Sequence, residues 1–229
     1  MRVILVRHGQ TEMNANGAYR GRINVPLSAS GIEESKALGR ALQNVTLDKV
    51  YSSPMGRALA TAGEIASYHS RISVEVADEF TDMDFGKWQG LTVREVEAQF
   101  PDSYRLWVRK PEQADIAGGE NLRRVRKRAL AGLKRIASLH PEATVAVVSH
   151  GVVNKVLLCA VLGAPVSAFW KVKQDTGALN LFEYSVFGTK VFLMNYVSHL
   201  ASIPDVISGM SYSRTPVGLS TDDERQNGA

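Results

Sequence analysis

Short runs of β-branched residues alternate with longer segments of helical periodicity along this chain, and this order constrains the fold more than any other feature. Strands are predicted at Val3–Val6, Lys49–Ser52, Ile72–Val76 and Val145–Val148, and two late strands near Leu179–Tyr184 and Val191–Tyr196. Helices are predicted at Gly31–Leu42, Met55–Tyr68, Asn121–Leu139 and Val152–Leu162, and from about Arg94. Such an order builds a mostly parallel central sheet with helices on both faces. The sequence therefore predicts an α/β fold, a three-layer sandwich.

The domain organisation follows from length and from a change of composition near the end. The chain has 229 residues, a common length for one α/β domain. After His199 the composition shifts to Ser, Gly, Pro, Asp and Arg without periodicity. We expect a single domain over residues 1–200 and a loosely ordered C-terminal tail over residues 201–229.

The apolar runs are short. The longest, Thr144–Val148 and Val152–Leu162, stay well below the roughly 20 residues of a membrane-spanning helix. The run Val3–Val6 passes directly into Arg7 and His8, which is too short for a signal peptide. These features predict a cytoplasmic protein that does not engage a membrane.

The predicted helix Asn121–Leu139 carries a basic cluster. Its members are Arg123, Arg124, Arg126, Lys127 and Arg128. They occupy the faces left over by an apolar stripe, and no aromatic residues are interleaved for base stacking. We interpret the cluster as a solvated face and expect no nucleic-acid partner. Binding of nucleic acid here is the alternative, and it predicts an affinity that falls steeply with salt.

Two predicted strands end in a histidine followed by a glycine. The first strand ends in Arg7-His8-Gly9, and the strand Val145–Val148 ends in Ser149-His150-Gly151. Ligands of open α/β sheets bind at the carboxyl edge of the strands. This pattern predicts a functional site at that edge.

A second arginine follows a third strand. The strand ends in Tyr51-Ser52-Ser53-Pro54, and Arg57 then falls in the first turn of a helix that the proline starts. Two arginines and two histidines can thus converge on one pocket, where guanidinium groups grip phosphate oxygens in bidentate fashion. The net charge of +4 is compatible with an anionic substrate.

Histidine can act as a nucleophile in such a pocket. A neutral imidazole nitrogen is free at neutral pH, and the positive charges of Arg7 and Arg57 favour that neutral form. Phosphoryl transfer depends mainly on positioning and charge stabilisation, which arginines can supply. A metal held by His8, His150 and Asp82 is the alternative, but guanidinium groups would repel the cation and no metal-ligand spacing occurs. We expect no cofactor.

An ordered set of motifs makes the chain resemble the histidine phosphatase superfamily, in its phosphoglycerate mutase-like branch. The set comprises Arg7-His8-Gly9 with Thr11 and Asn14, Gly21-Arg22, Pro26-Leu27-Ser28, Gly31, Ser52-Ser53-Pro54 with Arg57, Thr61-Ala62, and Ser149-His150-Gly151. The resemblance runs from Met1 to about Leu200. It implies a phosphoglycerate mutase-like fold and a phosphohistidine intermediate.

The resemblance also implies roles for individual residues. His8 is the expected nucleophile, and Arg7, Arg57 and His150 form the expected phosphate pocket. Asn14, Gly21 and Gly151 are expected to border it, whereas Arg22 is either a substrate contact or a solvated loop charge.

The expected general acid is Asp82, which precedes Gly86 by four residues where the family usually has glutamate. Its side chain is one methylene shorter, and its ordinary pKa is about 3.9 rather than about 4.3. Because a general acid needs hydrogen-bond contact with the leaving group, either the backbone sits closer or a water intervenes. Asp84 and Glu79 are the other candidates.

The stretch from Gly90 to Thr144 distinguishes the expected activities. It is compact, with a predicted loop around Trp107, Arg109 and Lys110, whereas mutases of the family carry a long lid insertion. We expect a phosphatase of a small phosphorylated metabolite, such as a sugar phosphate, a phosphoglycerate derivative, α-ribazole phosphate or phosphoserine. A mutase and a non-catalytic binding module are the alternatives, and a homodimer is left open.

Overall fold

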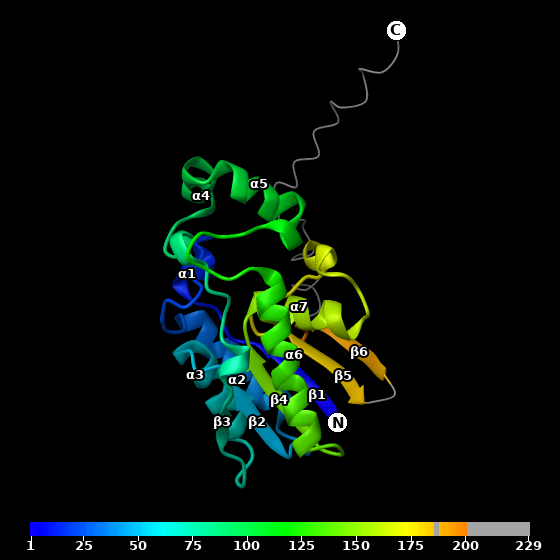
Figure 1. Ribbon diagram of the computed structural model, residues 1–229. Coiled ribbons are helices and arrows are strands. Elements are labelled where there is room, and N and C mark those ends of the chain that lie inside the picture. Colours follow the sequence, from blue (N-terminus) through cyan, green and yellow to red (C-terminus); the bar gives the residue numbers. More distant parts are fainter. Residues whose placement is uncertain (186–187, 201–229) are drawn as a thin grey trace.

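The fold is built on one six-stranded sheet with the strand order β3-β2-β4-β1-β5-β6 (Figure 1). The computed structural model describes residues 1–185 and 188–200, so the tail expected over residues 201–229 lies outside the described residues. The strands are β1 (Arg2–Arg7), β2 (Lys49–Ser52), β3 (Val74–Val76), β4 (Thr144–Ser149), β5 (Leu179–Ser185) and β6 (Gly188–Tyr196). The first four pair in parallel, and β5 and β6 join antiparallel. The predicted α/β sandwich with a mostly parallel sheet is confirmed.

Helices cover both faces of the sheet. α2 (Ala29–Leu42) and α3 (Gly56–Ala66) pack on one face, and α6 (Leu122–Leu139) and α7 (Gly151–Val161) on the other. Shorter elements complete the chain: α1 (Glu12–Ala15), α4 (Val93–Gln99), α5 (Pro101–Arg109), and the 3-10 turns η1 (Asp78–Phe80), η2 (Gly86–Trp88), η3 (Pro111–Gln113) and η4 (Val166–Lys171). Among the helices that the structure describes, none is both long and apolar enough to cross a bilayer.

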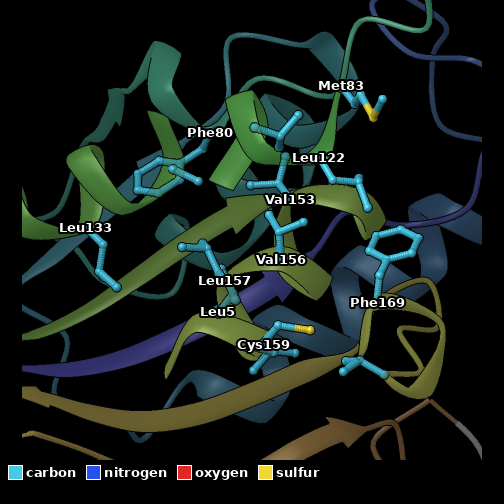
Figure 2. Packing of buried hydrophobic residues seen from close by; sticks show 14 of the residues in the cluster. Leu5, Phe80, Met83, Leu122, Leu133, Val153, Val156, Leu157, Cys159 and Phe169 are labelled. Carbon is cyan, nitrogen blue, oxygen red and sulfur yellow. The ribbon is translucent and has the colours of Figure 1, made fainter. Parts of the chain in front are cut away.

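The core follows from the alternation of side chains along the central strands. Leu5 of β1 belongs to one cluster with Val156 and Leu157 of α7, as Figure 2 shows, whereas Ile4 and Val6 face α2 and α3. Every residue of β4 is buried. Strands buried on both faces are typical of parallel sheets covered by helices, and they hold their ends rigidly.

Strand register brings the two histidines together. β1 and β4 are parallel neighbours, with Arg7 opposite Ser149, so His8 and His150 leave the sheet at the same edge. β2 flanks β4 on the other side, with Ser52 opposite Val148. The three motif-bearing strands therefore end side by side.

The predicted loop around Trp107 is wrong. Trp107 and Arg109 lie in α5, which begins with Pro101 in its first turn, and Lys110 follows directly after the helix. Trp107 is buried on this helix, and the aromatic rings of Phe85, Trp88 and Phe169 lie around it. In Figure 1, α4 and α5 lie next to each other, beyond the edge of the sheet at which β1 ends.

Candidate active site

Gly9 and Gly31 allow the loop that carries His8 to pack closely against the start of α2. A Cβ on Gly9 would lie 2.3 Å from the carbonyl oxygen of Gly31, and one on Gly31 would lie 2.0 Å from the carbonyl oxygen of Gln10. Both distances are far inside van der Waals contact, so the loop after β1 can lie against α2 only where both side chains are absent. The hydroxyl of Thr61 then accepts a hydrogen bond from the Gly9 N–H at 3.2 Å.

The imidazole of His8 is buried and held in one tautomer. Its Nδ1 lies 2.6 Å from the carbonyl oxygen of Gly9. A carbonyl oxygen can only accept, so Nδ1 carries the proton and Nε2 keeps its lone pair. Burial, followed by the charges of His150 and the arginines Arg20, Arg57 and Arg7, holds the pKa of His8 well below 6.5. At neutral pH His8 is therefore a neutral imidazole with a nucleophilic Nε2.

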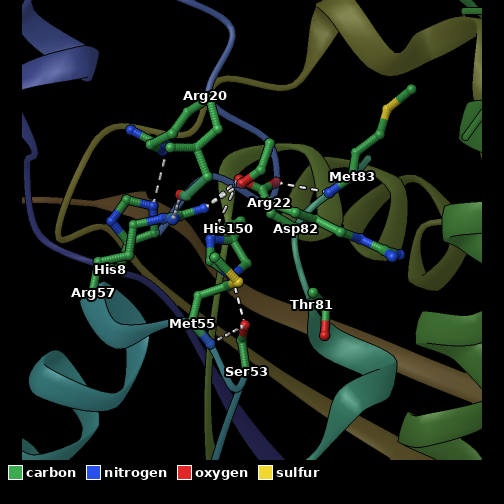
Figure 3. A network of polar contacts seen from close by, with 12 residues as sticks. His8, Arg20, Arg22, Ser53, Met55, Arg57, Thr81, Asp82, Met83 and His150 are labelled. Carbon is green, nitrogen blue, oxygen red and sulfur yellow. Dashed lines mark hydrogen bonds and ion pairs between the residues drawn. The ribbon is translucent and has the colours of Figure 1, made fainter. Parts of the chain in front are cut away.

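His150 lies beside His8, with 5.1 Å between the ring centroids. Its Nε2 is 2.7 Å from the Ser53 hydroxyl, and its Nδ1 is 3.5 Å from Oδ2 of Asp82 (Figure 3). Burial and the neighbouring arginines lower the pKa of His150 well below 6.5. The hydroxyl of Ser53 can donate to Nε2, which leaves an Nδ1–H donor directed at the Asp82 side of the site.

Two arginines lie where the sequence predicts them. Arg57 is fully buried, and its guanidinium donates to the carbonyl oxygens of Ile23 and Gly21 and to Oδ2 of Asp82 at 2.9 Å. Arg7 donates to the backbone carbonyl of Gln174 at 2.5 Å. Burial lowers the pKa of both groups. A guanidinium is among the most strongly basic groups in proteins, so both are treated as cations at neutral pH.

A third arginine, Arg20, was not predicted. It is 7% exposed, and its Nη2 lies 3.3 Å from Nε2 of His8 while its Nη1 donates to the Thr11 hydroxyl at 2.7 Å. Burial lowers the pKa of Arg20 to about 10, so it is charged at neutral pH. It sits within the Tyr19–Asn24 segment, where the motif pointed to its neighbours Gly21 and Arg22 instead.

The site holds more donors than acceptors. Nε of Arg7, Arg20 and Arg57, and Nδ1 of His150, are buried without a hydrogen-bond partner among the described residues. Of the carboxylates described, only Asp82 forms an ion pair with any of the three guanidinium groups. Three positive charges against one negative charge leave a formal surplus of two. Since buried polar groups without partners are costly, this arrangement favours a doubly charged oxyanion.

Asp82 is the carboxylate of the site. It is 4% exposed, and its Oδ1 accepts a hydrogen bond from the Met83 N–H while its Oδ2 faces Arg57 and His150. Asp82 also lines the cavity described below. The side chain of Asp82, although shorter than a glutamate, thus reaches Arg57 and His150 from the backbone segment between η1 and η2.

The other carboxylates near it are engaged elsewhere. Asp84 accepts a hydrogen bond from the Gly86 N–H and lies 3.8 Å from Arg22. Glu79 pairs with Arg135 at 2.8 Å, and this hydrogen bond lowers its pKa. Neither carboxylate lines the cavity.

Two of the predicted binding residues, Asn14 and Arg22, lie apart from the group around His8. The side chain of Arg22 is 44% exposed and forms ion pairs with Asp84 and Glu120, and in Figure 3 it extends away from His8. Asn14 lies in the first turn of α1 and completes a capping box with the N-cap Thr11, whose N–H and hydroxyl donate to its Oδ1. The structure therefore brings neither into the group around His8.

A cavity of about 220 Å³ opens over this group. Arg7, Arg20, Gly21, Asp82 and Gly151 line it. Phe85, Trp107, Lys155, Phe169, Trp170 and Gln174 are among the other lining residues. His8 and His150 are fully buried and are not among the lining residues. No three His, Cys, Asp or Glu side chains within the described ranges come together as metal ligands.

Comparison with known proteins identifies relatives over most of the chain. A family model described as the histidine phosphatase superfamily (branch 1) matches residues 3–197. Phosphoserine phosphatase 1 of Hydrogenobacter thermophilus is 34% identical over 200 residues, covering 87% of this chain and 94% of the relative. The adenosylcobalamin/α-ribazole phosphatase of Escherichia coli is 30% identical over 177 residues, covering 77% and 87%.

Solved structures agree with the fold. The structure of Bacillus stearothermophilus YhfR superposes with a TM-score of 0.83 at 28% identity, covering 87% of this chain and 99% of that one. A putative α-ribazole-5'-P phosphatase of Escherichia coli superposes with a TM-score of 0.78, also at 28% identity, covering 86% and 96%.

Proposed function

The chain belongs to branch 1 of the histidine phosphatase superfamily, and from this membership we propose that it hydrolyses small phosphomonoesters without a metal ion, through a phosphohistidine on His8. The observation that carries the proposal is the unprotonated Nε2 of His8, fixed by the Nδ1 contact to Gly9 and placed among the guanidinium groups of Arg7, Arg20 and Arg57, of which Arg20 and Arg57 are buried. A nucleophile and a charged cradle for the transferring group are the two parts that phosphoryl transfer requires.

In the first half-reaction, His8 Nε2 attacks phosphorus and the bond to the leaving oxygen breaks. Asp82, ionised in the free site, carries a proton once the doubly charged substrate is bound and gives that proton to the leaving oxygen, so the alcohol leaves neutral. Arg7, Arg57 and His150 donate to the phosphoryl oxygens. Because Arg20 Nη2 lies 3.3 Å from His8 Nε2, the Arg20 guanidinium has to shift from the nitrogen onto those oxygens as the substrate enters.

In the second half-reaction, water attacks the phosphorus of the phosphohistidine and the P–N bond breaks. The carboxylate of Asp82 takes the proton from the water, which restores the protonated acid of the substrate-bound state. The products are inorganic phosphate and the neutral imidazole of His8. The phosphoryl group is thus passed from the ester to water with no net change in the enzyme.

The direct test is release of inorganic phosphate from a panel of phosphomonoesters in the presence of EDTA. We expect release that EDTA does not change, and a kcat/KM that stays high down to pH 6.5, because the pKa of His8 is held well below that value. The panel contains O-phosphoserine, 3-phosphoglycerate, glycerol 3-phosphate and p-nitrophenyl phosphate. Isomerised phosphoglycerate without phosphate release would indicate a mutase, and binding without turnover would indicate a binding module.

Substitutions of Arg20 and Arg22 provide a test and its control, because Arg20 lies beside His8 and Arg22 does not. Arg20→Ala is expected to lower kcat/KM for p-nitrophenyl phosphate by roughly 10- to 150-fold, the equivalent of the ~1.5–3 kcal/mol of a charge-assisted hydrogen bond. Arg22→Ala removes a half-exposed side chain from its ion pairs and is expected to change kcat/KM by less than about threefold. Steady-state kinetics of both variants check this expectation. Equal losses would place Arg20 outside the phosphate pocket.

A further inference from the structure

Lys155 lies in the wall of the active-site cavity, and the mechanism above does not use it. Its Nζ sits 4.7 Å from the ring centroid of Trp170 and 4.9 Å from that of Phe169. Among the residues that the structure describes, Lys155 makes no hydrogen bond and no ion pair. Its ammonium is therefore a cation held against aromatic rings, with its N–H donors available to whatever fills the cavity.

The aromatic wall that holds Lys155 is rigid. The indole N–H of Trp170 donates to the backbone carbonyl of Trp107 at 2.7 Å, and the rings of Phe169 and Trp170 meet edge to face at 4.8 Å. Burial and, next, the charge of Arg7 lower the pKa of Lys155 to about 8, so the amine is still largely protonated at neutral pH. A lysine kept without a carboxylate partner in this setting is available to an anion from outside the protein.

Lys155 lies some distance from the place where the arginines would bind the phosphoryl group of a substrate. Gly151 opens α7 directly against the guanidinium of Arg7, where a Cβ would lie 3.3 Å from Nε. Lys155 follows four residues later on the same helix, which places it one turn and about 6 Å along the axis from that contact. A second anion bound there would be linked to the phosphate by a short carbon chain.

We propose that Lys155 binds a carboxylate of the leaving group, so that the preferred substrates are phosphomonoesters of short hydroxy acids. The inference rests on the proposed phosphatase function, and it selects one substrate class among those that the named relatives act on. The arginines take the phosphoryl oxygens, and Lys155 takes the negative charge at the far end of the leaving group. An ester with an uncharged leaving group leaves this ammonium without a partner.

A neighbouring cavity is lined mainly by aromatic and apolar side chains. Its volume is about 410 Å³, and it shares Tyr19, Trp107 and Trp170 with the wall of the active-site cavity. Tyr104 and Val108 also line it, which makes its surface suited to an uncharged ring. An enzyme that used this cavity for its leaving group would prefer an aryl ester to a carboxylate ester, irrespective of Lys155.

The test compares two esters that differ in one group. 3-Phosphoglycerate carries a carboxylate where glycerol 3-phosphate carries a hydroxymethyl group. We expect the wild-type enzyme to favour 3-phosphoglycerate, and Lys155→Met to lower the ratio of the two kcat/KM values at least 30-fold, mainly through the KM for the acid. Lys155→Arg, which keeps a cation, is expected to restore most of the ratio. Lys134→Met, a lysine of α6 outside this cavity, is the matched control and should leave the ratio unchanged.

The outcomes separate the two claims. Phosphate released from both esters at a ratio that Lys155→Met does not alter overturns the role of Lys155 and leaves the phosphatase standing, as does a wild-type preference for phenyl phosphate over 3-phosphoglycerate. Absence of release from every ester overturns the phosphatase and the inference together. Melting temperatures of the variants check that each is folded, and the arginine variant supplies the comparison if the methionine variant is not.

Discussion

Replacing His8 with alanine is expected to lower kcat by about 10⁴-fold or more on every phosphomonoester. Among the described residues, His150 has the only other imidazole in the site, and its Nε2 contacts the Ser53 hydroxyl, so no second nitrogen is available to replace His8 as nucleophile. The loss should fall on kcat, because the arginines that bind the phosphoryl group remain in place.

The measurement is made on the protein itself as well as on turnover. Wild-type enzyme mixed rapidly with substrate should gain the mass of one phosphoryl group, and that group should be labile in acid and stable in base. His8→Ala should show no such species. His140→Gln is the control, because His140 contacts the Tyr51 hydroxyl next to the start of β4, away from the edge that carries His8. A His8→Ala enzyme with normal turnover would remove the mechanism.

Asp82→Asn is expected to separate good leaving groups from poor ones. With glycerol 3-phosphate, whose alkoxide needs a proton to leave, kcat should fall by about 10²- to 10⁴-fold. With p-nitrophenyl phosphate, whose phenolate leaves without a proton, the fall should be about tenfold or less. The amide keeps the shape of the side chain and an oxygen for Arg57, so the difference between the esters reports the missing proton.

A neighbouring carboxylate provides the control for this substitution. Asp84 precedes Gly86 by two residues rather than four, and its side chain is committed to the Gly86 N–H and Arg22. Asp84→Asn should therefore affect both esters alike and weakly. Equal losses on both esters in Asp82→Asn would show that Asp82 positions Arg57 and is not the proton donor.

The sheet and the meeting of the two histidines could be predicted because both depend on short-range signals. Each of β1 and β4 is a continuous apolar run that ends in a histidine and a glycine, and parallel neighbours end at one edge. The pairing of these two strands then follows from the topology of α/β sheets. That His8 and His150 lie close together could be predicted without knowing where their side chains point.

Arg20 and α5 could not be predicted in the same way. Arg20 lies in a segment without periodicity, and its direction depends on long-range contacts with Thr11 and His8 and on Gly21, which has a φ of +53°. For α5, Pro101 was a signal of a helix start, and Tyr104, Trp107 and Val108 have the spacing of one helix face. That pattern is short, and the polar residues around it favoured a loop.

Lys155 had a signal that could have been used. Lys155 follows Gly151 by four residues, and residues four apart lie on the same face of a helix. Gly151 lies directly after the end of β4, so the sequence places Lys155 on the face of α7 that Gly151 occupies. What the sequence could not supply is the pair of rings beside it, since Phe169 and Trp170 come from η4, after the end of the helix.

The close contact between Gly9 and Gly31 bears on how natural variants of this protein should be interpreted. Gly31 lies in α2, outside the active-site cavity, and carries no chemical group that could bind or react. Yet any side chain there meets the backbone of the loop that holds His8. A survey of tolerated substitutions would therefore rank position 31 with the reactive residues, although its importance lies in the space that a hydrogen atom leaves free.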